Sequence, residues 1–434
     1  MKKKKSKSVI KIFTISVIIL VVVLGLIFSL KILYKKLINT EAQTKKTSKL
    51  YTLPYLTGYR KAPKKTGLTI FIPDKVWIGL NLFNSAHQPS AILMDIKGNI
   101  LHKWQFAFKD AFPEVKEINT WYNQKHWRYF WRRAHLFDNG DLLAIYEGNG
   151  LIKIDKDSHL IWATKGSFHH DLEVVGDKIY VLNRRLVTLP LINKKEPILE
   201  DLITILNQDG QILKNISILE MFENSRFARL MKGMPAAGDI FHTNTLEVFD
   251  GKLASKSPIF KKGNVLLSMR MLDTIAIADL KAKKIVWARK PGIWKTQHQP
   301  TLLDNGHMLV FNNLYLKKRA DKAEYRRLLT TNGYKLLKNK IYTDNQSSVI
   351  EFNPLSIAVV WEYKGDEKHK FFSLASGSCQ RLPNGNTLIT ESDPGRAFEV
   401  TPQGQIVWEY INPYRTGKNK AKIAAILEMQ RLLF

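Results

Sequence analysis

Cysteine is almost absent from this 434-residue chain, which contains only Cys379. A single cysteine excludes an intramolecular disulfide and any metal cluster held by several cysteines. Acidic residues are also scarce, because 38 aspartates and glutamates stand against 67 lysines and arginines, for a net charge of +29. This excess predicts attraction to anionic substrates, lipids or polysaccharides. No helix-turn-helix, zinc-finger or RNP-type pattern accompanies the charge, so nucleic acid is not predicted as a partner.

Long apolar runs are also missing, with one exception near the N-terminus, where residues 9–30 are mostly isoleucine, valine and leucine. About 20 such residues span a bilayer. The basic residues 1–8 precede the run, so they are expected to stay cytoplasmic and the bulk of the chain to be periplasmic. A cleaved signal peptide is the alternative, but no Ala-x-Ala site follows. We therefore predict a single-pass inner-membrane anchor at 9–30 and a juxtamembrane linker at 31–66.

From residue 67 onward, short apolar runs alternate with turn residues, and no helical period separates them. One approximate pattern reads apolar-x-Asp-x-x-Gly-x-apolar-apolar-x-x-Trp. Its copies lie at 93–104, 152–162, 205–216, 277–287, 349–361 and 398–408. A β-sandwich also alternates in this way, but it does not readily explain repeated copies of one hairpin. We predict an all-β fold with a six-bladed β-propeller over 67–415, preceded by the transmembrane helix. The tryptophans that close five of the six copies are expected to pack between blades. The tail, residues 416–434, is predicted to be a short helix outside the ring.

Three histidines occupy equivalent positions of this repeat. The segments that start at His169 and His298 superpose without a gap, and His242 fits the same position in another blade. The apolar runs that follow are the most continuously hydrophobic elements, so we interpret them as the innermost strands. Strands of this kind line the axial channel of a propeller, so the histidines are expected to meet at its mouth.

A second set of polar residues aligns at the far end of the same apolar runs, and consists of Arg184, Arg270 and Asn313. Apart from Asp171 and Glu147, few carboxylates are expected beside them. Donor-rich and acid-poor surroundings suit a tetrahedral oxyanion such as sulfate or phosphate. A zinc or copper site is the alternative, because three histidines suffice for either metal. Two arginines disfavour a cation, so no metal is predicted.

These motifs, with His170 after His169 and Thr243-Asn244 after His242, resemble the bacterial arylsulfotransferases, which are PAPS-independent aryl-sulfate sulfotransferases on a six-bladed propeller. The resemblance implies ping-pong transfer of a sulfuryl group between small phenolic molecules through a histidine, without a cofactor. It implies that His298 is the nucleophile. The predicted catalytic residues are His298, His242 and Arg270, and the predicted substrate-binding residues are His169, His170, Asn244, Asn313 and Arg184.

Two other functions are compatible with a basic propeller. One is a non-catalytic envelope protein that binds an anionic glycan or scaffolds a complex. The other is a quinone- or metal-dependent oxidoreductase. An activity assay with an aryl sulfate and a phenol separates the first from a transferase, and a bound cofactor would indicate the second.

Overall fold

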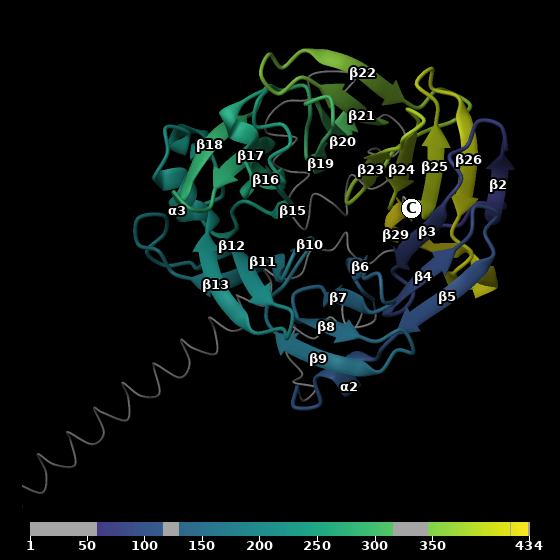
Figure 1. Cartoon of the computed structure of the whole chain (residues 1–434), viewed down its shortest axis with the longest axis horizontal. Helices are drawn as coiled ribbons and strands as arrows, with labels where there is room; N and C mark the ends of the chain where they lie inside the picture. Colours follow the sequence, from purple (N-terminus) through teal and green to yellow (C-terminus); the bar gives the residue numbers. More distant parts are fainter. Residues whose placement is uncertain (1–58, 116–129, 316–345, 417, 433–434) are drawn as a thin grey trace, which may run out of the picture. The chain divides into compact units, whose positions relative to one another are not determined.

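The computed structural model describes residues 59–115, 130–315, 346–416 and 418–432, and six β-sheets surround a central axis (Figure 1). Each sheet is a blade of four or five strands, so the predicted six-bladed β-propeller is confirmed. The predicted basic tail, the membrane anchor and most of the linker lie outside the described residues. Within the described ranges, no helix is both long enough and apolar enough to cross a membrane.

The first three blades follow one another from the N-terminal side of the ring, and their strands are given from the axis outward. The first contains β29 (Ile426–Leu432), β3 (Leu80–Ser85), β4 (Ser90–Met94) and β5 (Ile100–Gln105). The second contains β6 (Ala134–Leu136), β7 (Leu142–Tyr146), β8 (Gly150–Ile154) and β9 (Leu160–Lys165). The third contains β10 (Leu172–Val175), β11 (Lys178–Val187), β12 (Ile198–Asn207), β13 (Ile212–Ser217) and the short β14 (Gly238–Asp239).

The last three blades repeat the same order. The fourth contains β15 (Thr243–Val248), β16 (Asn264–Met269), β17 (Thr274–Asp279) and β18 (Lys284–Arg289). The fifth contains β19 (His298–Leu302), β20 (Met308–Tyr315), β21 (Gln346–Phe352) and β22 (Val359–Lys364). The sixth contains β23 (Ser378–Arg381), β24 (Thr387–Glu391), β25 (Arg396–Val400), β26 (Ile406–Ile411) and β2 (Gly67–Phe71).

Helices are few and short in the described residues. They are α2 (Phe108–Ala111), α3 (Ile218–Glu223) and the 3-10 turns η3 (Ala228–Met231), η4 (Pro258–Phe260), η5 (Arg270–Leu272) and η6 (Lys418–Lys420). A small separate sheet joins β1 (Tyr59–Lys61), β28 (Lys422–Ala424) and β27 (Arg415–Thr416). The end of the predicted linker therefore forms a strand that pairs with the C-terminal region.

Both ends of the described chain close the ring. β29 is the innermost strand of the first blade and runs antiparallel to β3, with Met429 opposite Phe83. β2 pairs with β26 as the outermost strand of the last blade. The predicted C-terminal helix is therefore wrong. Residues 426–432 form a strand because they pair with the open inner edge of the first blade, and this pairing buries Ile426 and Met429.

The apolar runs form the second strand of each blade, so the prediction that they are innermost is wrong. β7, β16 and β24 are buried along their whole length, because neighbouring blades cover both of their faces. The true inner strands, such as β10 and β19, contain half-buried residues that border the axis. Continuous apolar character therefore marks burial on both faces rather than proximity to the channel.

The tryptophans that end the repeats join one blade to the next, as predicted. In each case the indole N–H donates a hydrogen bond to a backbone carbonyl in a turn between two strands of the following blade. The pairs are Trp104–Gly140 (3.0 Å), Trp162–Gln208 (2.8 Å), Trp287–Pro354 (3.2 Å), Trp361–Pro402 (2.8 Å) and Trp408–Ile96 (2.8 Å). The last pair links the sixth blade to the first. A buried indole N–H needs such an acceptor, so these bonds fix the spacing of the blades.

Candidate active site

The predicted histidines lie where the inner strands begin. His298 is the first residue of β19, His242 directly precedes β15, and His169 and His170 come just before β10. His170 and His242 share a left-handed backbone, with φ of 54° and 52°. The nearest counterpart of His242 in the third blade is therefore His170. All four side chains are buried.

The second predicted set of residues meets the histidines at the same end of the channel. Because the second strand of a blade runs antiparallel to the first, its C-terminal end returns to the start of the inner strand. Arg184 lies in β11, Asn313 lies in β20, and Arg270 directly follows β16. The two predicted sets therefore form one cluster. Its members come from the third, fourth and fifth blades.

The imidazole of His298 has its tautomer fixed by its neighbours. Its Nδ1 lies 2.6 Å from Asn313 Oδ1 and 3.0 Å from the carbonyl oxygen of Thr296. Asn313 Nδ2 donates to the carbonyl oxygens of Ser373 and Ser376, so its Oδ1 is the atom that faces His298. Both neighbours of Nδ1 are acceptors, so Nδ1 bears the hydrogen and Nε2 retains its lone pair.

Asn313 is consequently a positioning residue. Its two amide hydrogens go to backbone carbonyls and its oxygen goes to His298. The predicted substrate-binding role does not fit this arrangement, because no polar atom of the side chain is left without a protein partner. The alignment of the internal repeats placed Asn313 in the cluster, but it could not distinguish contact with substrate from contact with a catalytic residue.

His242 forms a dyad with Asp239. Its Nδ1 lies 2.5 Å from Asp239 Oδ2, so the carboxylate orients the ring and leaves Nε2 for the channel. Burial lowers the pKa of His242, whereas Asp239 raises it, and the net result is a lowered pKa. The pKa of Asp239 is lowered in spite of burial because His242 and Arg184 stabilise the carboxylate. The His242–Asp239 pair can therefore exchange a proton with a substrate.

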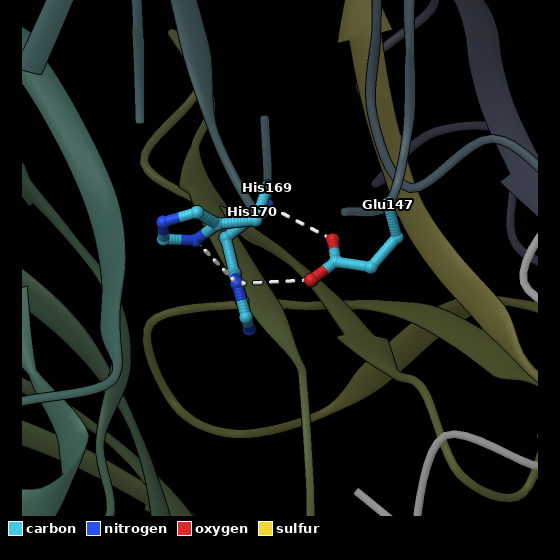
Figure 2. Close-up of side chains that lie close together, drawn as sticks. All are labelled: Glu147, His169 and His170. Atoms are coloured by element: carbon cyan, nitrogen blue, oxygen red, sulfur yellow. Dashed lines mark hydrogen bonds and ion pairs between the residues drawn. The ribbon is translucent and has the colours of Figure 1, made fainter. Parts of the chain in front are cut away.

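His169 and His170 form a compact group with Glu147 (Figure 2). Their Nδ1 atoms are 3.0 Å apart, so one must donate to the other. Glu147 Oε2 accepts the backbone N–H of His170 at 3.0 Å, and Oε1 lies 3.4 Å from His170 Nδ1. The ring of His170 lies edge-on to that of His242, with centroids 4.7 Å apart. The third and fourth blades are therefore in direct contact through histidines.

The site contains more carboxylates than the sequence predicted. Asp201 and Asp239 are buried beside it, and Arg184 bridges Glu147 Oε1 at 3.8 Å and Asp239 Oδ2 at 4.0 Å. Burial and the charge of Asp239 raise the pKa of Asp201 to about 7. The expectation of an acid-poor channel is therefore wrong, because these aspartates lie outside the aligned repeat positions. Much of the charge of Arg184 is used to neutralise them.

Arg270 and Asn244 complete the predicted set. Arg270 is buried, and its charge lowers the pKa of both His242 and His298. Asn244 Nδ2 donates to the carbonyl oxygen of Gln297 at 2.9 Å, so it anchors the segment that carries His298. The predicted contact of both residues with a sulfuryl group stays a prediction.

Burial is the main cause that holds the pKa of His298, His169 and His170 well below the ordinary value. Nearby cations add to this effect, with Arg270 acting on His298 and Arg184 on His169. The imidazoles are therefore neutral at pH 7 and able to use a lone pair. A buried group of neutral imidazoles and guanidiniums can bind an oxyanion and attack an electrophilic centre.

Comparison with known protein families shows the family to which this chain belongs. The family model described as arylsulfotransferase (ASST) matches residues 133–413, which is more than half of the sequence. The chain belongs to the arylsulfotransferase family. The match covers the second to fifth blades, the sixth blade apart from β2, and every predicted site residue of this arylsulfotransferase-family propeller.

Other comparisons give only distant likenesses. A search of curated proteins found no match to the arylsulfotransferase-family chain. Among solved structures, a Bacteroides caccae protein of unknown function is 12% identical with a TM-score of 0.45, over 81% of this chain and 98% of that one. A streptogramin B lyase structure is 11% identical with a TM-score of 0.42, over 88% and 100% of the two chains. The WD40 β-propeller domain of Doa1 is 10% identical with a TM-score of 0.40, over 82% and 88%. These likenesses do not bear on function.

A metal centre is a weaker interpretation of the same arylsulfotransferase-family site. Ligand atoms of Glu147, His169 and His170 lie within 4.8 Å of one another, which is close enough for a metal ion. However, Arg184 Nη2 lies 3.8 Å from Glu147 Oε1, and a guanidinium at this distance repels a cation. The donor set fits a hydrogen-bonded cluster beside an anion better than a metal centre.

Sequence reasoning missed several members of this site. Asp239 and Asp201 were not predicted because they are not repeated from blade to blade. Arg132 and Arg133, which directly precede β6, were not predicted either. Their neighbour His135 lies within β6 and packs against Phe137, with ring centroids 4.9 Å apart. These arginines lie just before an inner strand begins. Finding them from the sequence would have required the correct boundary of that strand.

Proposed function

We propose that this protein transfers a sulfuryl group from an aryl sulfate to a phenol by a ping-pong route through a sulfohistidine at His298. The fixed tautomer of His298, with Nδ1 bonded to Asn313 and the lone pair on Nε2, is the observation that carries the proposal. Family membership supports the same class of reaction. A neutral, oriented imidazole is a competent nucleophile near pH 7.

In the first step, the Nε2 lone pair attacks sulfur and an N–S bond forms. The bond between sulfur and the aryl oxygen breaks, and its electron pair leaves with the phenolate. In this proposal Arg270 and the His169–His170 pair hold the sulfuryl oxygens, whose charge is stabilised by donors already in place. The phenolate then takes the proton of the protonated His242 ring, which leaves His242 neutral for the second step.

In the second step, the oxygen of an acceptor phenol attacks the same sulfur. The N–S bond breaks, and its electron pair returns to Nε2. His242, oriented by Asp239, takes the phenol proton, which restores the site for another cycle. Atoms and electrons balance over the two steps without a further reactant.

The direct test uses the full chain in detergent with 4-nitrophenyl sulfate as donor and phenol as acceptor. Release of nitrophenol should depend on the acceptor, and His298→Ala should lower the rate by at least about 10³-fold. His307→Ala is a matched control, because His307 lies in the turn at the other end of β20 and pairs with Glu351 at 2.8 Å. Equal activity of His298→Ala and wild type would disprove the proposal.

We also propose that residues 9–30 anchor the chain in the inner membrane, with the propeller periplasmic. The apolar run and the basic residues 1–8 before it support this topology. Protease added to intact spheroplasts should digest the propeller while a cytoplasmic marker stays intact. Protection of both proteins would contradict the orientation.

A further inference from the structure

Arg132 carries a buried charge that has no ion-pair partner among the described residues. Its side chain is only 6% exposed. Nη1 donates a long hydrogen bond of 3.4 Å to the carbonyl oxygen of Leu427, and Nε is buried without a partner. The adjacent Arg133 differs, because it pairs with Asp171 at 2.7 Å and with Glu428. No carboxylate of the described residues lies within ion-pair distance of Arg132, although its charge acts from further away to lower the pKa of Glu147 and Asp171.

An unpaired guanidinium in the interior is costly. Removing an ion from water carries a penalty of several kcal/mol, and one long bond to a neutral carbonyl does not offset it. Packing does not require a charge at this position, because the neighbouring cluster of Ala86, Phe130, Ala425 and Leu427 is apolar. An anionic group that binds beside Arg132 during the reaction would explain why this buried position carries a charge.

The position of Arg132 in the ring indicates which anion this is. Arg132 lies two residues before β6, and β6 lies across the channel from β19, which begins with His298 (Figure 1). Its charge acts across the site, because it lowers the pKa of both His170 and His298. Arg132 therefore precedes a strand on the opposite side of the channel from β19 and lies within electrostatic range of the nucleophile.

Displacement at a tetrahedral sulfur follows the geometry of phosphoryl transfer, in which the attacking and leaving atoms lie roughly in line on opposite sides of the centre. If His298 attacks from the β19 side, the aryl oxygen departs toward the β6 side. We propose that Arg132 stabilises the phenolate oxygen that leaves when His298 takes the sulfuryl group. This inference rests on the proposed transferase function.

The chemistry of a guanidinium defines this role. Arginine does not lose its proton in proteins, so Arg132 acts as a fixed charge and hydrogen-bond donor, and it does not protonate the phenolate. The electron pair of the broken S–O bond stays on the aryl oxygen, close to the cation, until a proton arrives. Such a charge matters most when the leaving phenol is a weak acid. The substrate class is therefore sulfates of unactivated phenols, whose parent pKa is about 10.

The test compares full-length wild type, Arg132→Gln and Arg132→Lys on aryl sulfates whose leaving phenols differ in pKa. For Arg132→Gln, the loss in kcat should grow from about 10-fold with 4-nitrophenyl sulfate to about 10³-fold with phenyl sulfate. Arg132→Lys should recover part of the loss. Arg185→Gln is the control, because Arg185 lies on β11 and pairs with Glu200 at 2.6 Å, with half of its side chain exposed. It should leave the dependence on leaving group unchanged.

A uniform loss over the whole series, or no loss, would overturn the role of Arg132 while leaving the transferase proposal intact. If wild type transfers no sulfuryl group, the proposed function is wrong. The interaction of Arg132 with a phenolate is then tested by a binding measurement. In an absorbance titration, 4-nitrophenolate should bind wild type at least 10-fold more tightly than Arg132→Gln. Equal affinities would overturn the inference.

Discussion

At the scale of single residues, the central feature is the imidazole of His298, whose reactivity depends on two other blades as well as on its own. Asn313 orients the ring, and the carbonyl oxygens of Ser373 and Ser376 orient Asn313. Arg270, in the fourth blade, helps to keep the imidazole neutral. A chain of this kind holds the attacking atom in place before substrate binds, which lowers the barrier to reaction.

This arrangement predicts that Asn313→Ala lowers kcat by about 10- to 100-fold and leaves KM nearly unchanged, because loss of an orienting partner disturbs the nucleophile more than substrate binding. Steady-state kinetics at saturating acceptor measure both constants. Asn312→Ala is the matched control. Asn312 is an equally buried amide whose Oδ1 accepts the backbone N–H of Lys295 at 2.8 Å, with no bond to His298. Loss of activity in Asn312→Ala equal to that in Asn313→Ala would contradict the orienting role.

The sequence predicted those site residues that recur at equivalent positions of the repeat. His169, His242 and His298 could be grouped because they recur at similar points of the hairpin. Asp201 and Arg132 could not be found in this way, since each occurs in one blade and makes contacts with the neighbouring blade. A single sequence has no signal for such contacts, which depend on how the blades meet.

At the scale of strands, the repeat pattern predicted the hairpins well and their order from the axis poorly. The tryptophan at the end of each pattern was predicted to pack between blades, and its indole hydrogen bond explains why the spacing recurs. The C-terminal strand was mistaken for a helix because β29 matches no copy of the repeat. Its conformation is set by β3, which is 340 residues or more earlier in the chain.

β29 also contains Arg431, which joins the first and last blades. This residue is 1% exposed; Nε donates to Asn81 Oδ1 at 2.6 Å, and Nη1 lies 3.1 Å from Glu399 Oε2. Arg431→Met should lower the free energy of unfolding by about 3–5 kcal/mol, because it leaves Glu399 charged and buried. Denaturant titration measures the change. The double variant Arg431→Met/Glu399→Gln should recover part of it, and a double variant no more stable than the single one would argue against this explanation.

At the scale of the whole propeller, a second polar layer lies one residue further along the inner strands than the catalytic cluster. Arg133 pairs with Asp171 at 2.7 Å and with Glu428, and Gln299 Nε2 donates to Glu428 Oε1 at 2.8 Å. Asp171 Oδ2 in turn accepts the backbone N–H of Leu246 at 2.9 Å. These bonds connect the first five blades across the axis, so they stabilise the ring at the level of the site.

Beyond this layer, Glu247 makes the stability of the propeller depend on pH. Burial raises its pKa to about 8, from an ordinary value of 4.5. The folded state therefore retains a proton that the unfolded state has lost, and the free energy of unfolding falls as pH rises toward 8. Between pH 7 and 8.5, above the ordinary pKa of histidine, Glu247→Gln should show a smaller fall than wild type. Thermal unfolding across this range measures the slopes.

Glu114→Gln is the control for this measurement, because Glu114 is exposed at the surface. Its slope should equal that of wild type. A wild-type stability that is constant from pH 7 to 8.5, or a slope unchanged by Glu247→Gln, would show that the buried carboxyl does not govern the dependence.

Trapping the covalent intermediate tests the sulfohistidine at His298 most directly. Full-length protein is mixed with an aryl sulfate in the absence of acceptor, quenched under alkaline conditions and digested for mass spectrometry. The peptide containing His298 should gain the mass of one sulfuryl group on that histidine, and added phenol should remove it. Product formation with no labelled peptide, or with the label on a different residue, would contradict a sulfohistidine at His298.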